Sequence, residues 1–135
     1  FNMADRLLGV TSPLVDGPIA LIAYQLHAVE SSLVAYVSLL ATRPGKATDV
    51  AVDKERWRGR GLGRLLLHLV ARIAQVHARC KPVFVELQCD RRVKGLCSFY
   101  ESCGFFVVNE LATGTTVVWD GFTRLRWSPG RTPAF

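Results

Sequence analysis

The chain has 135 residues, the length of one domain, and half of them are apolar, as in a globular protein rather than a disordered one. No apolar run reaches the roughly 18 residues of a transmembrane helix, which argues against a membrane-spanning protein. The net charge of +6 indicates a polyanionic partner, such as nucleic acid, a membrane surface or a phosphorylated ligand.

The cysteines and histidines show no metal-binding pattern. Four cysteines, at positions 80, 89, 97 and 103, form no C-x-x-C pair, and the three histidines do not stand at a zinc spacing. We therefore predict free thiols and no metal site. Free thiols are typical of a reducing compartment, so we expect a cytoplasmic location, with the nucleus as the alternative.

The N-terminal half is predicted to consist mostly of strands. Residues 1–17 hold a short amphipathic patch and a stretch marked by Pro and Gly, and form an N-terminal remnant. Apolar and β-branched residues predict strands at 19–29, 33–41 and 47–53, joined by short turns. Such short connections favour an antiparallel meander.

The periodicity then changes to that of a helix. Between residues 62 and 76, apolar side chains recur three or four positions apart, opposite a polar stripe that begins at Arg64. A strand at 82–87 follows. Because a strand, a helix and a strand form a crossover, we expect the strands 47–53 and 82–87 to be parallel.

Shorter elements complete what we predict to be a single domain over residues 1–135. A short helix is expected at about 95–103, with Gly104 as its stop. It is followed by a strand at 105–108, a hairpin formed by 116–119 and 122–127, and a frayed tail at 128–135.

A glycine-rich loop, Arg58-Gly59-Arg60-Gly61-Leu62-Gly63, lies between a predicted strand and the long helix. The first turn of a helix has free backbone N–H groups and a partial positive charge, and glycines let a phosphate approach those groups closely. Basic residues surround the glycines: Lys54, Arg56, Arg58, Arg60 and Arg64. The loop therefore predicts a pyrophosphate site, and the alternative is a glycine-rich helix start without a ligand.

Two other phosphate-binding patterns fit this loop poorly. A dinucleotide fingerprint needs G-x-G-x-x-G, but here the third glycine comes one position early and position 64 is Arg. A Walker loop needs G-K-[ST], whereas Gly45-Lys46-Ala47 lacks the hydroxyl group and precedes a strand.

Two motifs resemble those of the GCN5-related N-acetyltransferases, the GNAT family. Arg58, Gly61 and Gly63 occupy the positions of motif A, [R/Q]-x-x-G-x-[G/A], whose loop binds the pyrophosphate of coenzyme A in that family. The heptapeptide 99–105, Phe-Tyr-Glu-Ser-Cys-Gly-Phe, resembles motif B. The resemblance covers about residues 18–127. Together with Cys89-Asp90, motif B is also similar to that of glucosamine-6-phosphate N-acetyltransferases.

The resemblance implies an α/β (α+β) GNAT fold, with a mixed, mostly antiparallel sheet and a βαβ crossover. Residues 1–17 are too few for the strand and two helices with which the family begins, so these elements are reduced or missing. The implied activity is acetyl-CoA-dependent N-acetylation, by direct transfer to a primary amine in a ternary complex. The alternatives are a non-catalytic acyl-CoA-binding module on the same fold and, less favoured, a basic nucleic-acid-binding module.

The resemblance also implies roles for individual residues. Tyr100 would protonate the thiolate leaving group, and its alternative is an aromatic residue that packs in the helix. The strand 47–53 corresponds to the family's fourth strand, on which Val50, Ala51 and Val52 line the acetyl and pantetheine groups. The residues expected to bind the coenzyme phosphates are Arg58, Gly59, Arg60, Gly61, Leu62, Gly63 and Arg64, with Arg56 as a further candidate.

The base and the acceptor stay open at this point. Asp49 is the first candidate for the base, with Glu86, Asp90 and an ordered water as alternatives, and each carboxylate has the simpler interpretation of an ion-paired side chain. The acceptor would be a small molecule, such as an aminosugar phosphate, or a protein amine. A homodimer is compatible with the sequence, whereas nucleic acid and membrane are not expected as partners.

Overall fold

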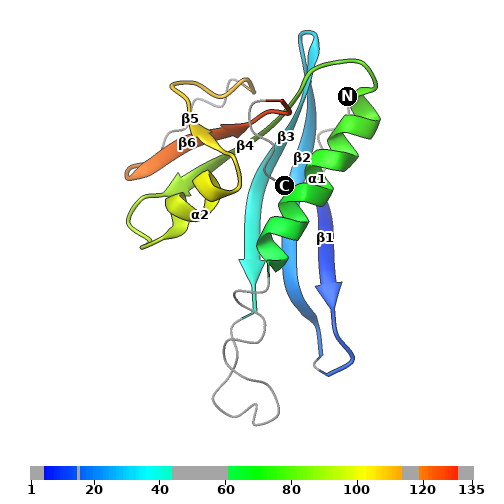
Figure 1. Ribbon diagram of the computed structural model, residues 1–135, viewed down its shortest axis with the longest axis vertical. Coiled ribbons are helices and arrows are strands. Elements are labelled where there is room, and N and C mark those ends of the chain that lie inside the picture. Colours follow the sequence, from blue (N-terminus) through cyan, green and yellow to red (C-terminus); the bar gives the residue numbers. More distant parts are fainter. Residues whose placement is uncertain (1–4, 15, 44–60, 114–118, 131–135) are drawn as a thin grey trace.

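A computed structural model gives the fold of the chain and describes residues 5–14, 16–43, 61–113 and 119–130. Among these residues, six strands form one sheet in the order β1-β2-β3-β4-β6-β5, and two helices pack on it (Figure 1). The elements are β1 (Arg6–Thr11), β2 (Pro18–Val29), β3 (Ser32–Thr42), α1 (Leu62–Ala78), β4 (Val83–Asp90), α2 (Leu96–Ser102), β5 (Phe106–Val107) and β6 (Phe122–Trp127). The sheet is antiparallel except between β3 and β4, which confirms the mixed, mostly antiparallel sheet predicted from the sequence.

The antiparallel meander is confirmed, but it starts earlier than predicted. Strands β2 and β3 match the predicted strands and pair through a tight turn at Glu30, whose φ is 53°. Strand β1 pairs with β2 from Arg6 opposite Tyr24 onward. The sequence predicted only an amphipathic patch there, although Leu8 and Val10 alternate toward the core as the side chains of a strand do.

The parallel pair among the described residues has a different first strand from the one predicted. The described parallel neighbour of β4 is β3, with pairs running from Leu33 opposite Val83 to Tyr36 opposite Glu86. The predicted pairing of 47–53 with 82–87 stays a prediction. Residues 47–53 lie outside the described residues.

Helix α1 confirms the helix that was predicted from the apolar periodicity between residues 62 and 76. Its apolar stripe packs against β1, β2, β3 and β4, so the helix covers the main core. Its buried residues are Leu66, Leu67, Val70, Ala71, Ala74 and Ala78. No helix among the described residues has both the length and the apolar character needed to cross a membrane.

The C-terminal elements agree with the prediction in part. Helix α2 lies within one residue of the predicted bounds, and β6 occurs where the second strand of a hairpin was expected. However, β6 pairs with β4 and β5. The first strand predicted for that hairpin falls largely on 114–118, outside the described residues.

The two faces of β4 differ in polarity. Val85, Leu87 and Cys89 point into the core beneath the helices, whereas Glu86 and Gln88 point to the opposite face. Glu86 is nonetheless fully buried. Its carboxylate accepts hydrogen bonds from the backbone N–H of Ala112, at 2.9 and 3.0 Å, and from Arg126 Nε at 2.7 Å.

The Glu86–Arg126 ion pair therefore joins β4, β6 and the segment that follows β5. Arg126 also donates to the carbonyl oxygen of Glu110 at 3.1 Å, and its guanidinium lies 5.0 Å from the centre of the Phe84 ring. A buried charge destabilises the folded protein unless an opposite charge is paired with it. The pair thus fixes β4 to β6 on the face of the sheet opposite the helices.

Replacing Arg126 with Met should destabilise the fold strongly, because it leaves the buried Glu86 carboxylate without its cation. We expect a loss of about 3–5 kcal/mol in the free energy of unfolding, measured by urea denaturation. Arg92→Met is the matched control, since it removes an exposed ion pair with Asp90 (2.9 Å) and should change stability little. Equal effects of the two substitutions would contradict the anchoring role of Arg126.

Candidate functional site

The candidate site begins where β3 and β4 separate. Their parallel pairing ends at Tyr36 and Glu86, although β3 continues to Thr42 and β4 to Asp90. Figure 1 shows the two strands diverging beyond this point. Past the last pair, no described strand occupies the edge of β3 that faces β4.

A β-bulge marks the same place on β3. Ala23 pairs with Leu39 but Tyr24 pairs with Val37, so Ser38 is the extra residue of the bulge. The hydroxyl of Ser38 donates to the carbonyl oxygen of Ala23 at 3.3 Å. A bulge bends its strand and breaks the ladder locally, and bulges are frequent beside functional sites.

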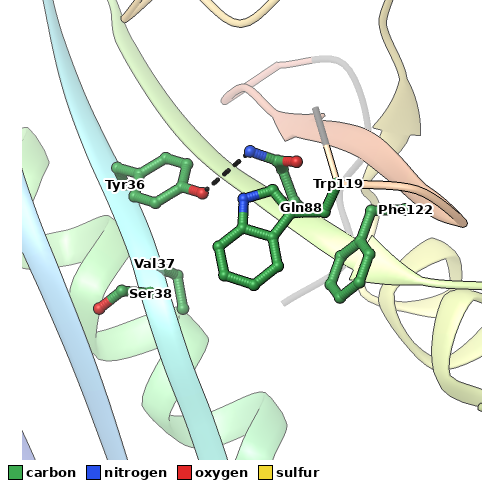
Figure 2. A pocket seen from close by; sticks show the side chains of 6 residues that line it. All are labelled: Tyr36, Val37, Ser38, Gln88, Trp119 and Phe122. Carbon is green, nitrogen blue, oxygen red and sulfur yellow. Dashed lines mark hydrogen bonds between the residues drawn. The ribbon is translucent and has the colours of Figure 1, made fainter. Parts of the chain in front are cut away.

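A pocket of about 400 Å³ lies at this divergence. It is lined by Tyr36, Val37, Ser38, Gln88, Trp119 and Phe122. Figure 2 shows the amide of Gln88 directed at the hydroxyl of Tyr36, to which its nitrogen donates at 3.4 Å. The Trp119 and Phe122 rings contact each other with their centres 5.7 Å apart. The volume falls within the range typical of small-molecule sites.

The N-terminus of α1 fits the predicted phosphate cradle. Gly61 precedes the helix with a φ of 76°, and no side chain caps the helix start. A Cβ atom at Gly61 would meet nothing within 4 Å, so the backbone there is open to a ligand. The first-turn N–H groups therefore keep the free donors and partial positive charge that attract an anion.

Gly63 and Arg64 make contacts inside the protein. A Cβ atom at Gly63 would stand 3.2 Å from Cζ of Phe99 in α2, so the glycine allows close packing between the helices. The guanidinium of Arg64 donates to the carbonyl oxygen and to the hydroxyl of Ser102, at 3.1 and 3.0 Å. Arg64 thus ties the start of α1 to the end of α2, and its phosphate-binding role stays a prediction.

Most of the predicted donor-binding residues lie outside the described residues. They are Val50, Ala51, Val52, Arg56, Arg58, Gly59 and Arg60, and the candidate base Asp49 lies outside them too. Their predicted roles are untested by the structure. Gly61, Leu62 and Gly63 are described, and they stand at the helix start as the sequence predicted.

Tyr100 lies in the core rather than in the pocket wall. It is 7% exposed, and its ring makes edge contacts with Phe99 and Phe105, at 5.2 and 5.7 Å between ring centres. Burial raises the pKa of its phenol well above the ordinary value, and nearby cysteines add to the rise. The phenol therefore stays protonated at neutral pH, as a proton donor must.

Three cysteine sulfurs gather near the Tyr100 ring. Cys89 of β4 and Cys97 of α2 have their sulfurs 2.9 Å apart, and Cys103 is buried beside them. Burial, together with the hydrogen bond to Cys97, raises the pKa of Cys89 to about 12. Burial likewise raises the pKa of Cys103. Among the described residues, no three His, Cys, Asp or Glu side chains are placed so that they could hold a metal ion together.

The two described carboxylates considered as bases are both engaged elsewhere. Glu86 is enclosed by Arg126 and Ala112, as described above. Asp90 binds Arg92 through two side-chain contacts of 2.9 and 3.2 Å, and these hydrogen bonds hold the pKa of Asp90 below its ordinary value. Neither carboxylate lines the pocket, so the simpler interpretation of paired side chains fits both.

Sequence reasoning missed the pocket residues. Tyr36, Ser38 and Gln88 occupy ordinary strand positions, and Trp119 and Phe122 flank a turn far along the chain. Only the turn carried a signal, since Asp120-Gly121 between two aromatic residues predicts a tight reversal that brings them together. The bulge at Ser38 has no sequence signature, because it depends on the register with β2.

Comparisons with known proteins agree with this geometry. Residues 21–107 match the sequence profile of a family described as acetyltransferase (GNAT) domain. No curated protein sequence matches the chain. Similar solved structures include Tetrahymena GCN5, with a TM-score of 0.61 and 13% identity over 97% of this chain and 72% of that one.

Two further similar structures contain CoA or a CoA-based analogue. One is a chain of the NatC complex bound to Gag peptide and CoA, with a TM-score of 0.55 and 16% identity over 82% of this chain. The other is Arabidopsis thaliana Naa50 bound to a bisubstrate analogue, CoA-Ac-MVNAL, with a TM-score of 0.54 and 17% identity over 82% of this chain. The chain spans 61% and 65% of these two proteins, respectively.

Proposed function

Since the chain belongs to the GNAT acetyltransferase family, we propose that it transfers an acetyl group from acetyl-CoA to a primary amine. The observation that carries this proposal is the opening between β3 and β4, with a pocket at its mouth and the uncapped start of α1 in the same domain. An extended donor can lie in such an opening, with its phosphates at a helix N-terminus.

The donor phosphates would bind at the start of α1. The free N–H groups of Leu62 and Gly63, beside the open backbone of Gly61, offer hydrogen bonds to a pyrophosphate. The loop 58–60 precedes them directly in sequence and supplies two arginines. Arg64 supports this cradle by fixing the helix start to Ser102, whether or not it also contacts a phosphate.

The pantetheine arm would pair with β3. In the family, the fourth strand pairs with pantetheine, and the sequence predicted that 47–53 takes this place. Among the described residues β3 stands beside the parallel β4, so the edge of β3 beyond Tyr36 is a further candidate for this pairing, and the role of 47–53 stays a prediction. The bulge at Ser38 would then expose backbone N–H groups near the thioester oxygen, where negative charge develops.

Tyr100 is the candidate acid of the reaction. When the amine attacks the thioester, the sulfur leaves as a thiolate and needs a proton. Tyr100 lies on the helix side of the sheet, whereas the aromatic pocket lies on the opposite face. A thioester between β3 and β4 would therefore meet the amine from one face and the phenol from the other.

A non-catalytic acyl-CoA-binding module is the second candidate. The observation in its favour is that Tyr100 is nearly buried and does not line the pocket. Such a module would bind acetyl-CoA at the same helix start without releasing thiol. Binding and turnover measurements therefore separate the two functions.

Acetyl-CoA should stabilise the protein against heat, and this effect should depend on Gly61. At a concentration 100 times the dissociation constant, we expect a gain of about 2.7 kcal/mol in the free energy of unfolding. Gly61→Ala adds a Cβ at the proposed phosphate site and should weaken acetyl-CoA binding, measured by calorimetry. Gly17→Ala is the matched control, because Gly17 has the same positive φ and equally open surroundings in another turn. Absence of any stabilisation at millimolar acetyl-CoA would refute both candidate functions.

Tyr100→Phe should slow turnover without weakening donor binding. Proton transfer to the leaving group contributes about 100-fold or more to a rate, so kcat for thiol release should fall by at least that factor. The ring contacts with Phe99 and Phe105 persist in the variant, so the affinity for acetyl-CoA should stay the same. Tyr24→Phe, in the core on β2, is the control. An unchanged kcat in a regime limited by chemistry would show that Tyr100 is only a packing residue.

A further inference from the structure

The pocket at the mouth of the opening is unusually aromatic for its size. Three of its six described lining residues are Tyr36, Trp119 and Phe122, and a fourth, Val37, is aliphatic. Each aromatic comes from a different place in the fold, namely β3, the turn before β6 and the start of β6. Figure 2 shows their rings around the pocket together with Gln88.

None of the six described lining residues carries a charge. A described cation beside the pocket wall is Arg92, whose guanidinium lies 6.0 Å from the centre of the Phe122 ring. Its donors already bind the carboxylate of Asp90 through two contacts. The described wall therefore offers no free cation to a phosphate, which is what an aminosugar phosphate acceptor would need.

The exposure of Trp119 supports a role in binding. Its side chain is 60% exposed, whereas large aromatic side chains usually bury most of their surface. Its contact with Phe122 leaves part of the indole ring open to the pocket. An apolar ligand group that covers this ring would gain the free energy of removing both surfaces from water.

We propose that this pocket binds the acceptor through a large apolar or aromatic group carried close to its primary amine, an inference that rests on the proposed acetyl transfer. The rings of Trp119 and Phe122 hold the apolar group, and the Tyr36 and Gln88 side chains orient its polar end toward β3. An apolar wall also disfavours the ammonium form, and loss of that proton gives the neutral amine that attacks the thioester.

Two kinds of acceptor carry an apolar group close to a primary amine, and a representative of each can be tested directly. One is a small aralkylamine, represented by 2-phenylethylamine, and the other is a peptide N-terminus, represented by a tetrapeptide that begins with Phe. Glucosamine 6-phosphate and a tetrapeptide that begins with Gly serve as comparison acceptors. Thiol release from acetyl-CoA by the full chain gives kcat/KM for each amine.

We expect one or both apolar probes to exceed the comparison acceptors by about tenfold or more in kcat/KM, as pocket contacts of this size allow. Trp119→Ala should raise KM for the favoured probe about tenfold, while Trp119→Phe retains most of the affinity. Leu7→Ala, at an exposed apolar residue on β1, should leave KM unchanged. The affinity for acetyl-CoA, measured separately by calorimetry, should not change in any of these variants.

The outcomes distinguish this inference from the proposed function. Acetyl-CoA binding with a preference for glucosamine 6-phosphate, or with no transfer to either apolar probe, would overturn the inference and leave the donor site standing. Equal KM values for the Trp119→Ala and wild-type proteins would also overturn it. No binding of acetyl-CoA would remove the proposed function, and the inference with it.

A second inference follows from the cysteine pair. The sulfurs of Cys89 and Cys97 are only 2.9 Å apart and belong to a strand and a helix. A disulfide bond joins sulfurs at about 2.05 Å, so a small movement would suffice to form one. The geometry points to a reversible disulfide that links α2 to β4 when a hydroperoxide oxidises the pair.

The chemistry starts at Cys97, which is partly exposed, whereas Cys89 is buried. The Cys97 thiolate attacks one oxygen of hydrogen peroxide, and the sulfur becomes a sulfenic acid as hydroxide leaves. The Cys89 sulfur then attacks the Cys97 sulfur and loses its proton, and the sulfenic oxygen departs as water. In sum, two thiols and one peroxide give one disulfide and two waters.

Hydrogen peroxide should therefore remove two hydrogens from the protein mass, and peptide mapping should place the link between Cys89 and Cys97. Thiol release should slow on oxidation, because Tyr100 lies in the linked helix, and dithiothreitol should restore the rate. Cys97→Ser should abolish the link, while Cys80→Ser, at an exposed cysteine, should retain it. A stable sulfinic acid at Cys97, or a link that involves Cys80, would overturn the inference.

Discussion

The arrangement of the site depends on the point where parallel pairing between β3 and β4 ends. After Tyr36 and Glu86, each strand is held from its outer side, β3 by β2 and β4 by β6. The bulge at Ser38 bends β3, while the Glu86–Arg126 pair binds β4 to β6. Because the opening is bounded by two well-paired strands, it can admit a ligand without loss of the sheet.

The sequence predicted those elements that depend mainly on residues close together in the chain. The stripe of Leu66 and Val70 in α1 repeats at helical spacing, so its period identified the helix without knowledge of its neighbours. Strands β2 and β3 were equally predictable from the sequence, since they are long and bounded by turn residues. Strand pairing is not local, so the sequence did not predict the parallel pairing of β3 with β4.

The same distinction applies to the site. Gly61 was predictable, because a helix start that lacks a side-chain cap depends only on the residues around it. Trp119 and Tyr36 were not, because they meet only after β3, β4 and β6 are placed in one sheet. Glu86 shows the opposite case: a carboxylate near the expected site looked like a base, but the fold encloses it in an ion pair.

The contacts between α1 and α2 explain why the glycine loop and the motif B tyrosine occur together. Gly63 lets Phe99 pack against the first turn of α1, and Arg64 holds the end of α2 through Ser102. Tyr100 follows Phe99 directly, so the position of the phenol depends on the helix start that would bind the donor phosphates. A Cβ atom at position 63 would stand 3.2 Å from Cζ of Phe99, so the Phe99 ring would have to shift slightly. The start of α1 and the phenol of α2 thus form one packed unit, which would couple the proposed donor binding to the position of the proposed acid.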